Sequence, residues 1–241
     1  VTLPIGNPTE VLPPEILNYA ENETLKPFMY NDSIEGAIVF YTYPGASTAN
    51  SSYSRTELRE LMNPVDKGIT NWTFAQGGYM KGTLAVSDIS KDDEGNYHRA
   101  IIMQIHGRLT NEQRDLIGAK DNNAPPILKI YWNNGFVRVK TKVLKDLTDS
   151  YEELLETDAW GDDDGFNFEE EVGFSKFTLE VKVSDGKMVI VLNKNEYKVY
   201  ENVHIRKWGV FENYFKAGNY FQTRDKGAFS KVRFYELEVS H

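Results

Sequence analysis

The sequence of 241 residues contains no cysteine. Disulfide bonds, a thiolate nucleophile and a cysteine-ligated metal site are therefore excluded. Long hydrophobic runs are also missing. The apolar stretches are short pieces such as MVIVL at 188–192, whereas a membrane-spanning helix needs roughly 20 residues. We therefore expect no membrane-spanning segment.

The chain also lacks an excess of basic residues. It has 27 Lys and Arg against 36 Asp and Glu, which gives a net charge of −9 and argues against a nucleic-acid partner. The acids are unevenly distributed, because residues 149–171 contain eleven of them and no Lys or Arg. Without that stretch the remaining residues carry a net charge of +2. The negative net charge of the whole chain is therefore compatible with a locally basic groove.

The first residues, VTLPIGNPTE, include no initiator methionine, basic segment or apolar segment. Either a signal peptide has been removed or the chain has been trimmed. Four Asn-X-Ser/Thr triplets would be glycosylated only in a eukaryotic secretory pathway, and they begin at Asn22, Asn31, Asn50 and Asn71. We expect a secreted or periplasmic protein.

The composition predicts one globular domain over residues 1–241. Hydrophobic residues make up 40% of the chain and aromatic residues 13%, which is ample for a core. All-β domains of this length commonly remain undivided. Residues 1–35 are polar and proline-rich, with at most a short helix over 15–22, and are expected to form an N-terminal strap.

Alternating strands dominate the rest of the chain. Residues 128–143 form two such runs around Asn134-Gly135, a strong hairpin signal. Residues 177–200 alternate in the same way, with turns at 185–186 and 193–195, and residues 231–240 form a last strand. The only other helical pattern is brief, at 110–118. We therefore predict an all-β, single-domain antiparallel β-sandwich or jelly roll with a few short helices.

The segment SRTELRE at 54–60 supports two interpretations. Ser54 and Glu57 have the spacing of a helix capping box, and apolar residues follow at helical spacing. In a strand, by contrast, alternation places Arg55, Glu57 and Arg59 together on one face. Local rules favour the helix, so the decision depends on the rest of the chain.

Residues 100–107, AIIMQIHG, form a predicted strand with one polar pair. Alternation places Ile101, Met103 and Ile105 on one face and Gln104 and His106 on the other. A lone histidine on a strand is more often a structural residue than a functional one.

Two further strands have polar faces. In 214–222 the apolar face carries phenylalanine and alanine, and the polar face carries Tyr214, Lys216, Gly218, Tyr220 and Gln222. In 136–143 the polar face carries Arg138, Lys140 and Lys142. Each face alone is typical of an ordinary solvated strand. Side by side on a concave sheet, the polar faces would suit an extended anionic sugar chain.

Three blocks now point to a known family: SRTELRE at 54–60, QIH at 104–106 and YFKAGNYFQ at 214–222. In this order and separation they resemble the signature blocks of the alginate lyases of polysaccharide lyase family 7. The resemblance implies that the first block is a strand lining the concave substrate groove of a β-jelly roll, which decides for the strand interpretation. It also implies that the polymer is cleaved by β-elimination.

The resemblance implies roles for residues in each block. Arg55, Gln104, His106 and Tyr220 form the expected catalytic set. The expected substrate-binding residues are Glu57, Arg59, Tyr214, Lys216 and Gln222 from the blocks, together with Arg138, Lys140 and Lys142 from the polar face of 136–143. Neither a metal nor an organic cofactor is required. Ile105, between the Gln and the His, implies a preference for guluronate-containing alginate.

The chemistry explains why such residues are needed. The C5 proton of a uronate is weakly acidic, because the neighbouring carboxylate opposes carbanion formation. Arg55 and Gln104 can neutralise that carboxylate. His106 can remove the C5 proton as base, and Tyr220 can donate a proton to the leaving O4 as acid. The acidic stretch 149–171 should lie away from the middle of the groove, where it would repel the polymer.

Two alternatives remain open at this stage. A noncatalytic carbohydrate-binding module could use the same tyrosines and lysines, and a glycoside hydrolase would need two carboxylates flanking the bond, of which only Glu57 is a candidate. We expect a monomer whose partner is alginate or an oligoalginate.

Overall fold

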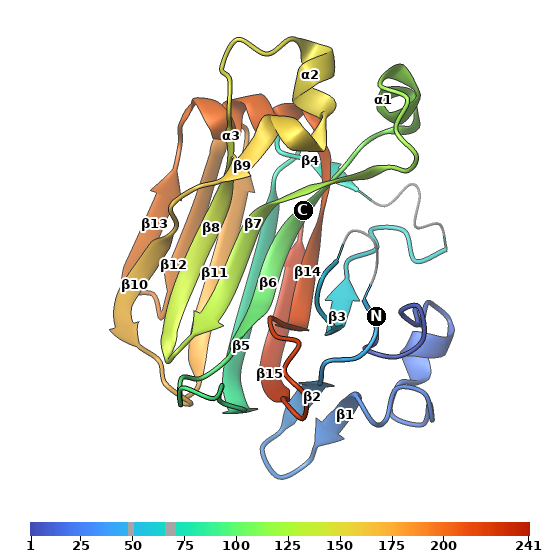
Figure 1. Ribbon diagram of the computed structural model, residues 1–241, viewed down its shortest axis with the longest axis vertical. Helices are drawn as coiled ribbons and strands as arrows, with labels where there is room; N and C mark the ends of the chain where they lie inside the picture. The colour runs from blue at the N-terminus through green and yellow to red at the C-terminus, as the bar shows by residue number, and fades with distance from the viewer. Residues whose placement is uncertain (48–50, 66–70) are drawn as a thin grey trace.

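The computed structural model describes residues 1–47, 51–65 and 71–241. In this part of the chain two antiparallel sheets pack face to face as a sandwich, and the strands of both run along its long axis (Figure 1). The predicted all-β fold class is confirmed.

The described part of the first sheet has seven strands, in the spatial order β1-β2-β15-β5-β11-β12-β13. Their bounds are Met29–Asp32 (β1), Ala37–Thr42 (β2), Ser230–Ser240 (β15), Gly78–Ile89 (β5), Phe177–Ser184 (β11), Lys187–Leu192 (β12) and Glu196–Tyr200 (β13).

The described part of the second sheet has the main order β10-β8-β7-β6-β14-β3, with β4 added to β14 and β9 to β8. Their bounds are Phe166–Glu171 (β10), Phe136–Leu144 (β8), Asn123–Asn133 (β7), Arg99–Arg108 (β6), Glu212–Phe221 (β14), Arg55–Arg59 (β3), Trp72–Thr73 (β4) and Trp160–Asp162 (β9).

Short helices connect the strands, and α1, α2 and α3 gather at one end of the sandwich (Figure 1). The helices are η1 (Glu15–Asn18), α1 (Asn111–Leu116), α2 (Tyr151–Leu155), η2 (Thr157–Ala159), α3 (Val203–Lys207) and η3 (Trp208–Val210). The prediction at 110–118 is confirmed by α1, while α2 and α3 were not predicted. In the described part of the chain, no helix is both long and apolar enough to span a lipid bilayer.

The predicted hairpins are present. Asn134 and Gly135 both adopt positive φ, 49° and 88°, between β7 and β8, as a tight hairpin turn with the right twist requires. β11, β12 and β13 pair in sequence through the predicted turns. Residues 55–59 form strand β3, so the strand interpretation of SRTELRE is confirmed.

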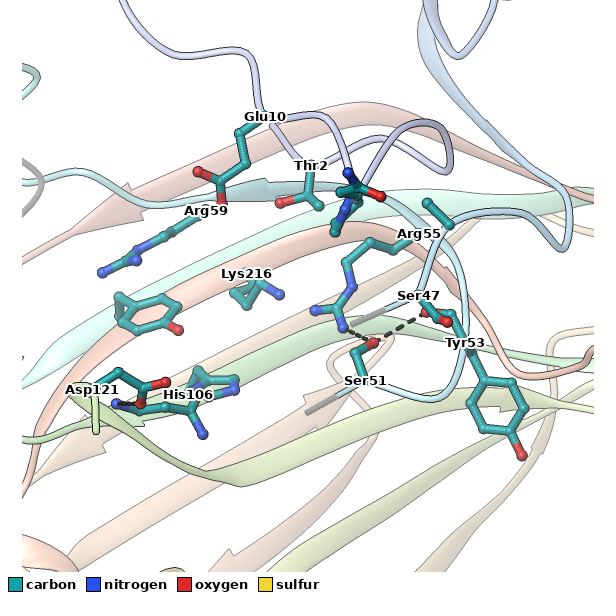
Figure 2. A pocket seen from close by; sticks show the side chains of 15 residues that line it. Thr2, Glu10, Ser47, Ser51, Tyr53, Arg55, Arg59, His106, Asp121 and Lys216 are labelled. Atoms are coloured by element: carbon teal, nitrogen blue, oxygen red, sulfur yellow. Dashed lines mark hydrogen bonds between the residues drawn. The ribbon is translucent and has the colours of Figure 1, made fainter. Parts of the chain in front are cut away.

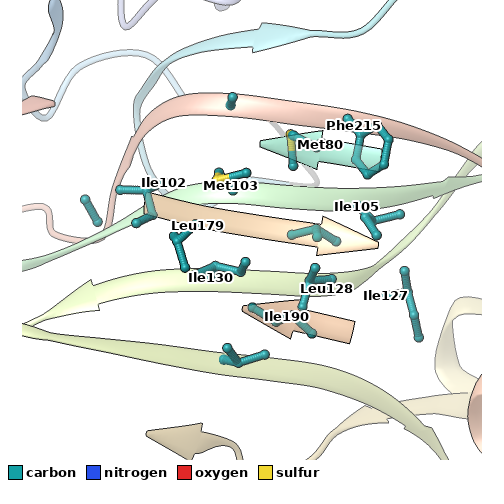
Figure 3. Packing of buried hydrophobic residues seen from close by; sticks show 14 of the residues in the cluster. Met80, Ile102, Met103, Ile105, Ile127, Leu128, Ile130, Leu179, Ile190 and Phe215 are labelled. Atoms are coloured by element: carbon teal, nitrogen blue, oxygen red, sulfur yellow. The ribbon is translucent and has the colours of Figure 1, made fainter. Parts of the chain in front are cut away.

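The core lies between the two sheets (Figure 3). Met80, Leu179 and Ile190 come from the first sheet, and they face the apolar side chains of β6, β7 and β14. Phe215, Ala217 and Phe221 of β14 belong to this core, as the predicted alternation required. The buried apolar side chains therefore support one face of the second sheet and leave its polar side chains on the other face.

One detail of the predicted alternation in β6 is wrong. Ile102, Met103 and Ile105 belong to the core cluster, and Ile101 does not. The pairing of β6 with β7 shifts register between Ile101 and Met103, and a bulge of this kind reverses the side-chain alternation. Ile101 instead pairs with Tyr220.

The N-terminal segment runs beside β3 (Figure 1). The backbone of Thr2 exchanges two hydrogen bonds with that of Glu57, at 2.9 and 3.1 Å, and so occupies the outer edge of β3. The short helix expected over 15–22 is limited to η1, and β1 already belongs to the first sheet. The strap thus covers a strand edge that would otherwise expose backbone donors and acceptors.

Candidate active site

The adjacent strands β6, β14 and β3 bring the three sequence blocks together. Tyr214 lies opposite His106, and Lys216 lies between Gln104 and Arg59. Tyr220 lies opposite Arg55. Segments far apart in the sequence thus form one surface on the face of the sheet away from the core.

Glu57 is the centre of this surface and is fully buried. Its carboxylate forms an ion pair with Lys216, lies 3.5 Å from Arg55 and accepts a 2.5 Å hydrogen bond from the Gln104 amide. A buried carboxylate is tolerated only when charges and donors of this kind compensate it. Glu57 therefore orients the lysine, the arginine and the amide that surround it.

Gly218 allows β14 to approach β3 at this point. Its φ is +145°, and a Cβ atom placed there would lie 2.6 Å from the carbonyl oxygen of Thr56 and 2.8 Å from the Cα of Glu57. A larger residue would push the two strands apart. The glycine of the third block therefore permits the close approach of β14 to β3 beneath the site.

Two arginines of β3 lie over two tyrosines of β14. The guanidinium carbon of Arg55 is 4.0 Å from the ring centre of Tyr220, and that of Arg59 is 3.8 Å from the ring centre of Tyr214. The other side of Tyr214 stacks on His106, at 5.2 Å between ring centres and 12° between planes. Cation–π contacts and stacking hold these five side chains in fixed orientations.

His106 is neutral in this environment. Desolvation by burial is the main cause, and the positive charge of Lys216 adds to it, so that the pKa of His106 falls to about 3. Its Nδ1 lies 3.0 Å from the carbonyl oxygen of Gly107. Because a carbonyl only accepts, Nδ1 carries the proton and Nε2 keeps a free lone pair.

Lys216 is also perturbed. Burial lowers the pKa of Lys216 to about 8, although the negative charge of Glu57 acts in the opposite direction. Burial raises the pKa of Tyr214, so its phenol stays protonated. The site therefore contains a lysine that loses its charge in mildly alkaline solution, beside arginines that remain charged.

A cavity of about 580 Å³ lies above this surface. Figure 2 shows Thr2 and Glu10 on one side of it, His106 and Asp121 on the other, and Lys216 between them. Its lining residues are Thr2, Asn7, Pro8, Glu10, Ala46, Ser47, Ser51, Tyr53, Arg55, Arg59, His106, Asp121, Asn123, Tyr214 and Lys216. The cations of the floor and the neutral imidazole thus face one space that can hold a ligand.

Several residues of this cavity were missed by the sequence analysis. Thr2 and Glu10 come from the strap, Asp121 precedes β7, and Ser51 precedes β3. All lie outside the alternating strands, so no periodicity singles them out. Ser51 has the strongest connection to the predicted residues, because its hydroxyl contacts Tyr220 and Arg55.

Seven of the predicted site residues are not among those that line this cavity. Glu57 and Gln104 are buried beneath it, and Tyr220 is connected to it through Ser51 and Arg55. Gln222 follows β14, and its amide bonds to the carbonyl of Tyr220. Arg138, Lys140 and Lys142 lie on β8, two strands beyond β6. Their role in binding stays a prediction.

The acidic stretch 149–171 runs along the outer edge of β8, where its strands β9 and β10 pair with β8. Asp162 pairs with Lys129 and Lys142, at 2.7 Å each, and Arg138 donates to Asn167 at 2.7 Å. Although burial alone would raise it, hydrogen bonds and charge from the two lysines hold the pKa of Asp162 below its usual value. Among the described residues, those lining the cavity include none from 149–171.

In residues 1–47, 51–65 and 71–241, no group of three or more His, Cys, Asp or Glu side chains is arranged to hold a metal ion. What these residues present is two arginine forks, two phenols and one neutral imidazole on adjacent strands. Such a set can bind a carboxylate and move protons beside it.

A model of the alginate lyase family matches residues 1–241. The chain belongs to the alginate lyase family. It is therefore a polysaccharide lyase, and the resemblance found in the three blocks is confirmed. The comparison with curated proteins finds no match.

Solved structures of alginate lyases are similar over the whole chain. Alginate lyase A1-II′, a member of polysaccharide lyase family 7, is 27% identical with a TM-score of 0.78, over 100% of this chain and 92% of the other. A variant of it in complex with the substrate GGMG is 27% identical with a TM-score of 0.76, over 100% and 90%. An alginate lyase from Pseudomonas aeruginosa, at 21% identity, a TM-score of 0.71 and coverages of 100% and 96%, shares the fold.

Proposed function

We propose that this alginate lyase cleaves its polymer by β-elimination at the surface formed by Arg55, His106 and Tyr220. The observation that carries the proposal is the neutral imidazole of His106, with Nε2 unprotonated, on the same floor as the arginine fork. Elimination needs a base that is unprotonated near neutral pH and a cation at the carboxylate next to the reacting carbon.

Arg55 and Lys216 would neutralise the substrate carboxylate. Both already face a carboxylate, that of Glu57, but Glu57 is a single acid shared by two cations and an amide. A uronate carboxylate in the cavity would supply a second negative charge. Its enolate-like form, which gains charge as the C5 proton leaves, would be stabilised more strongly than the ground state.

Gln104 would act in a more restricted way than the sequence alone indicated. Its side chain is buried, and one amide hydrogen is already donated to Glu57. Only the second N–H remains for the substrate carboxylate. The bond to Glu57 would fix the orientation of the amide, so that this hydrogen is directed before the substrate arrives.

The proton transfers would be divided according to the sugar. Mannuronate and guluronate are C5 epimers, so the C5 proton and the O4 leaving group lie on the same side in one and on opposite sides in the other. Tyr220 alone can act as base and acid for mannuronate. Guluronate requires groups on two sides, with His106 as base and Tyr220 as acid.

A preference for guluronate-containing polymer is part of the proposal. It is supported by the related lyase variants, which bind the oligosaccharides GGG and GGMG. Ile105, which motivated the preference, lies in the core and pairs with Phe215 and Leu128. Any effect of Ile105 on specificity would therefore be indirect, through the position of its neighbour His106.

Ultraviolet absorbance tests the reaction type, because β-elimination creates a C4=C5 double bond. The wild-type protein should raise the absorbance of an alginate solution in step with new reducing ends. Tyr220→Phe should lower kcat by about 10²- to 10⁴-fold, the usual contribution of acid–base catalysis, on both polymers. New reducing ends without absorbance would indicate a hydrolase and refute the proposal.

The division of roles has its own test. His106→Ala should reduce kcat on polyguluronate more than on polymannuronate, by about tenfold or more, because only guluronate uses the imidazole as base. Thermal melting should show that the variant remains folded. Equal losses on the two polymers in a folded variant would leave His106 with a positioning role alone.

A further inference from the structure

We propose that Ser51 is a positioning residue that connects Arg55 to the phenol of Tyr220 and supports the phenol in both of its protonation states. The inference rests on the proposed role of Tyr220. It assigns a function to a residue that lies outside the three family blocks and outside any strand pattern.

The contacts of Ser51 are specific. Its Oγ lies 2.9 Å from the Tyr220 hydroxyl and 3.1 Å from the Tyr53 carbonyl oxygen, and it accepts a hydrogen bond from Nη2 of Arg55. Figure 2 shows Ser51 directly beside the Arg55 guanidinium, with the Tyr53 ring directed away from both. The serine is buried, with 7% of its surface exposed.

The segment around Ser51 is held by other bonds. Arg224 donates to the carbonyl of Ser52 at 3.0 Å. The hydroxyl of Ser54 accepts from the backbone of Gly45 and donates to that of Ala46, at 2.6 and 2.9 Å. Ser51 is therefore positioned by its own chain neighbours, and its hydroxyl does not have to hold the loop.

Counting donors limits what the hydroxyl can do. Ser51 has one O–H and two lone pairs, and Arg55 can only donate, so one lone pair is always used. When Tyr220 is protonated, it can donate to the second lone pair while Ser51 donates to the Tyr53 carbonyl. When Tyr220 is ionised, rotation of the Ser51 O–H turns the hydrogen from that carbonyl to the phenolate.

By rotating its O–H, Ser51 can thus hydrogen-bond to Tyr220 both when the phenol is protonated and when it is ionised. In the ionised state the phenolate receives a hydrogen bond from a serine that is itself polarised by a guanidinium, while the guanidinium of Arg55 lies over the ring. A tyrosine acting first as base and then as acid passes through both states. The serine therefore supports the oxygen at each stage without moving a heavy atom.

The other groups facing Tyr220 do not replace this contact. Arg55 approaches the ring face, and its Nη2 bonds to the serine. Tyr131 on β7 has its pKa raised to about 12, mainly by burial, with only a small contribution from Tyr220, and Arg99 on β6 lies over the Tyr131 ring. Among the described side chains, Ser51 is the one hydrogen-bonded to the Tyr220 oxygen.

The proposal predicts a shift in pH dependence as well as in rate. Without the Ser51 hydroxyl the phenolate loses a hydrogen bond, and a higher pH is needed to form it. The acidic limb of the profile on polymannuronate, where Tyr220 is the base, should move to higher pH. On polyguluronate, where Tyr220 is the acid, the alkaline limb should move to higher pH.

The experiment compares wild type with Ser51→Ala, Ser51→Thr and Tyr220→Phe by absorbance on both polymers across the pH range. Ser51→Ala should lower kcat by about 10- to 100-fold, as expected for a hydrogen bond to a charged group, with KM nearly unchanged. Ser51→Thr retains a hydroxyl and should recover most of the rate. The exposed neighbour provides the control, because Ser52→Ala should match wild type.

The outcomes separate the two proposals. If Tyr220→Phe is active, the proposed function fails. If Tyr220→Phe is inactive while Ser51→Ala keeps the wild-type rate and pH limbs, only the inference about Ser51 fails. A loss in Ser51→Ala that is equal at every pH would assign it a structural role and also overturn the inference. Should the alanine variant not fold, Ser51→Cys, a similar shape with a weak donor, takes its place.

Discussion

Two halves of the same sheet face contain similar cations that have different surroundings. In the open half, Arg55, Arg59 and Lys216 of β3 and β14 line the cavity. In the covered half, Lys129, Arg138 and Lys142 of β7 and β8 are bonded to the acidic stretch through Asp162, Asn167 and the backbone of Asp164.

The difference lies in the carboxylates. The open half is organised around one buried acid, Glu57, which bonds to the cations from below and leaves their upper side to the cavity. In the covered half, the acidic chain lies across the cations, and a Cβ on Gly165 would lie 3.1 Å from Lys140. We therefore expect the anionic polymer to bind the half whose counter-ion lies beneath the cations.

The largest expected effect concerns the two key carboxylates. Glu57→Ala should lower the free energy of unfolding by about 3–5 kcal/mol, because the buried Lys216 and the half-buried Arg55 lose their partner. Asp162→Ala, the matched change in the covered half, should cost at most about 1 kcal/mol, since its ion pairs are partly exposed. Urea denaturation of both variants measures the difference. Similar values for the two would contradict the distinction between the halves.

The next effect concerns pH. Lys216 has its pKa lowered to about 8, so it loses its charge as the pH rises through that value. Binding of an anionic sugar favours the charged form, and the affinity should therefore fall by up to about tenfold per pH unit above pH 8.

Calorimetry with an oligoalginate and the Tyr220→Phe variant measures this dependence. Adding Lys216→Met to that variant should give a weaker affinity that is flat between pH 7.5 and 9.5. A slope that persists without the lysine would assign the titration to another group.

The smallest effect is expected from uncovering the covered half. Asp162→Asn releases Lys129 and Lys142, which should lower KM for alginate by about two- to threefold, the size expected for exposed charges. Added salt should weaken binding in wild type and more strongly in the variant. Steady-state kinetics at two ionic strengths measures both. An unchanged KM would show that the polymer does not reach β8.

The sequence predicts the second sheet well because its strands alternate. Phe215 and Ala217 are in the core, and Lys216 faces the cavity, as a period of two requires. The failure at Ile101 has a local cause, since a bulge adds one residue to β6 and nothing in an apolar run marks its position.

Two identical local signals had opposite outcomes. Ser150 and Glu153 form a capping box that begins α2. Ser54 and Glu57 have the same spacing, but Ser54 directly precedes strand β3 and Glu57 lies within it. Ser54 bonds instead to the backbone of 45 and 46. Pairing of β3 with β14 outweighs local helix propensity, and only the family blocks indicated this in advance.

Residues outside the strands could not be predicted from any pattern. Ser51, Glu10 and Asp121 reach the cavity from the strap and from two segments that lie between strands. Their positions depend on tertiary contacts that have no sequence period. Conversely, Arg138 and Lys142 have a clear period and lie outside the cavity, because alternation does not show what covers a face.

The central claim is that the open half does the chemistry and the covered half does not. The most direct test is the initial rate of ultraviolet absorbance increase on alginate for Arg55→Lys and Arg138→Lys, which keep the charge and remove the planar fork. The account predicts a loss of about 100-fold or more for Arg55→Lys and a change within about threefold for Arg138→Lys. A comparable loss in both, or a near wild-type rate for Arg55→Lys, would contradict it.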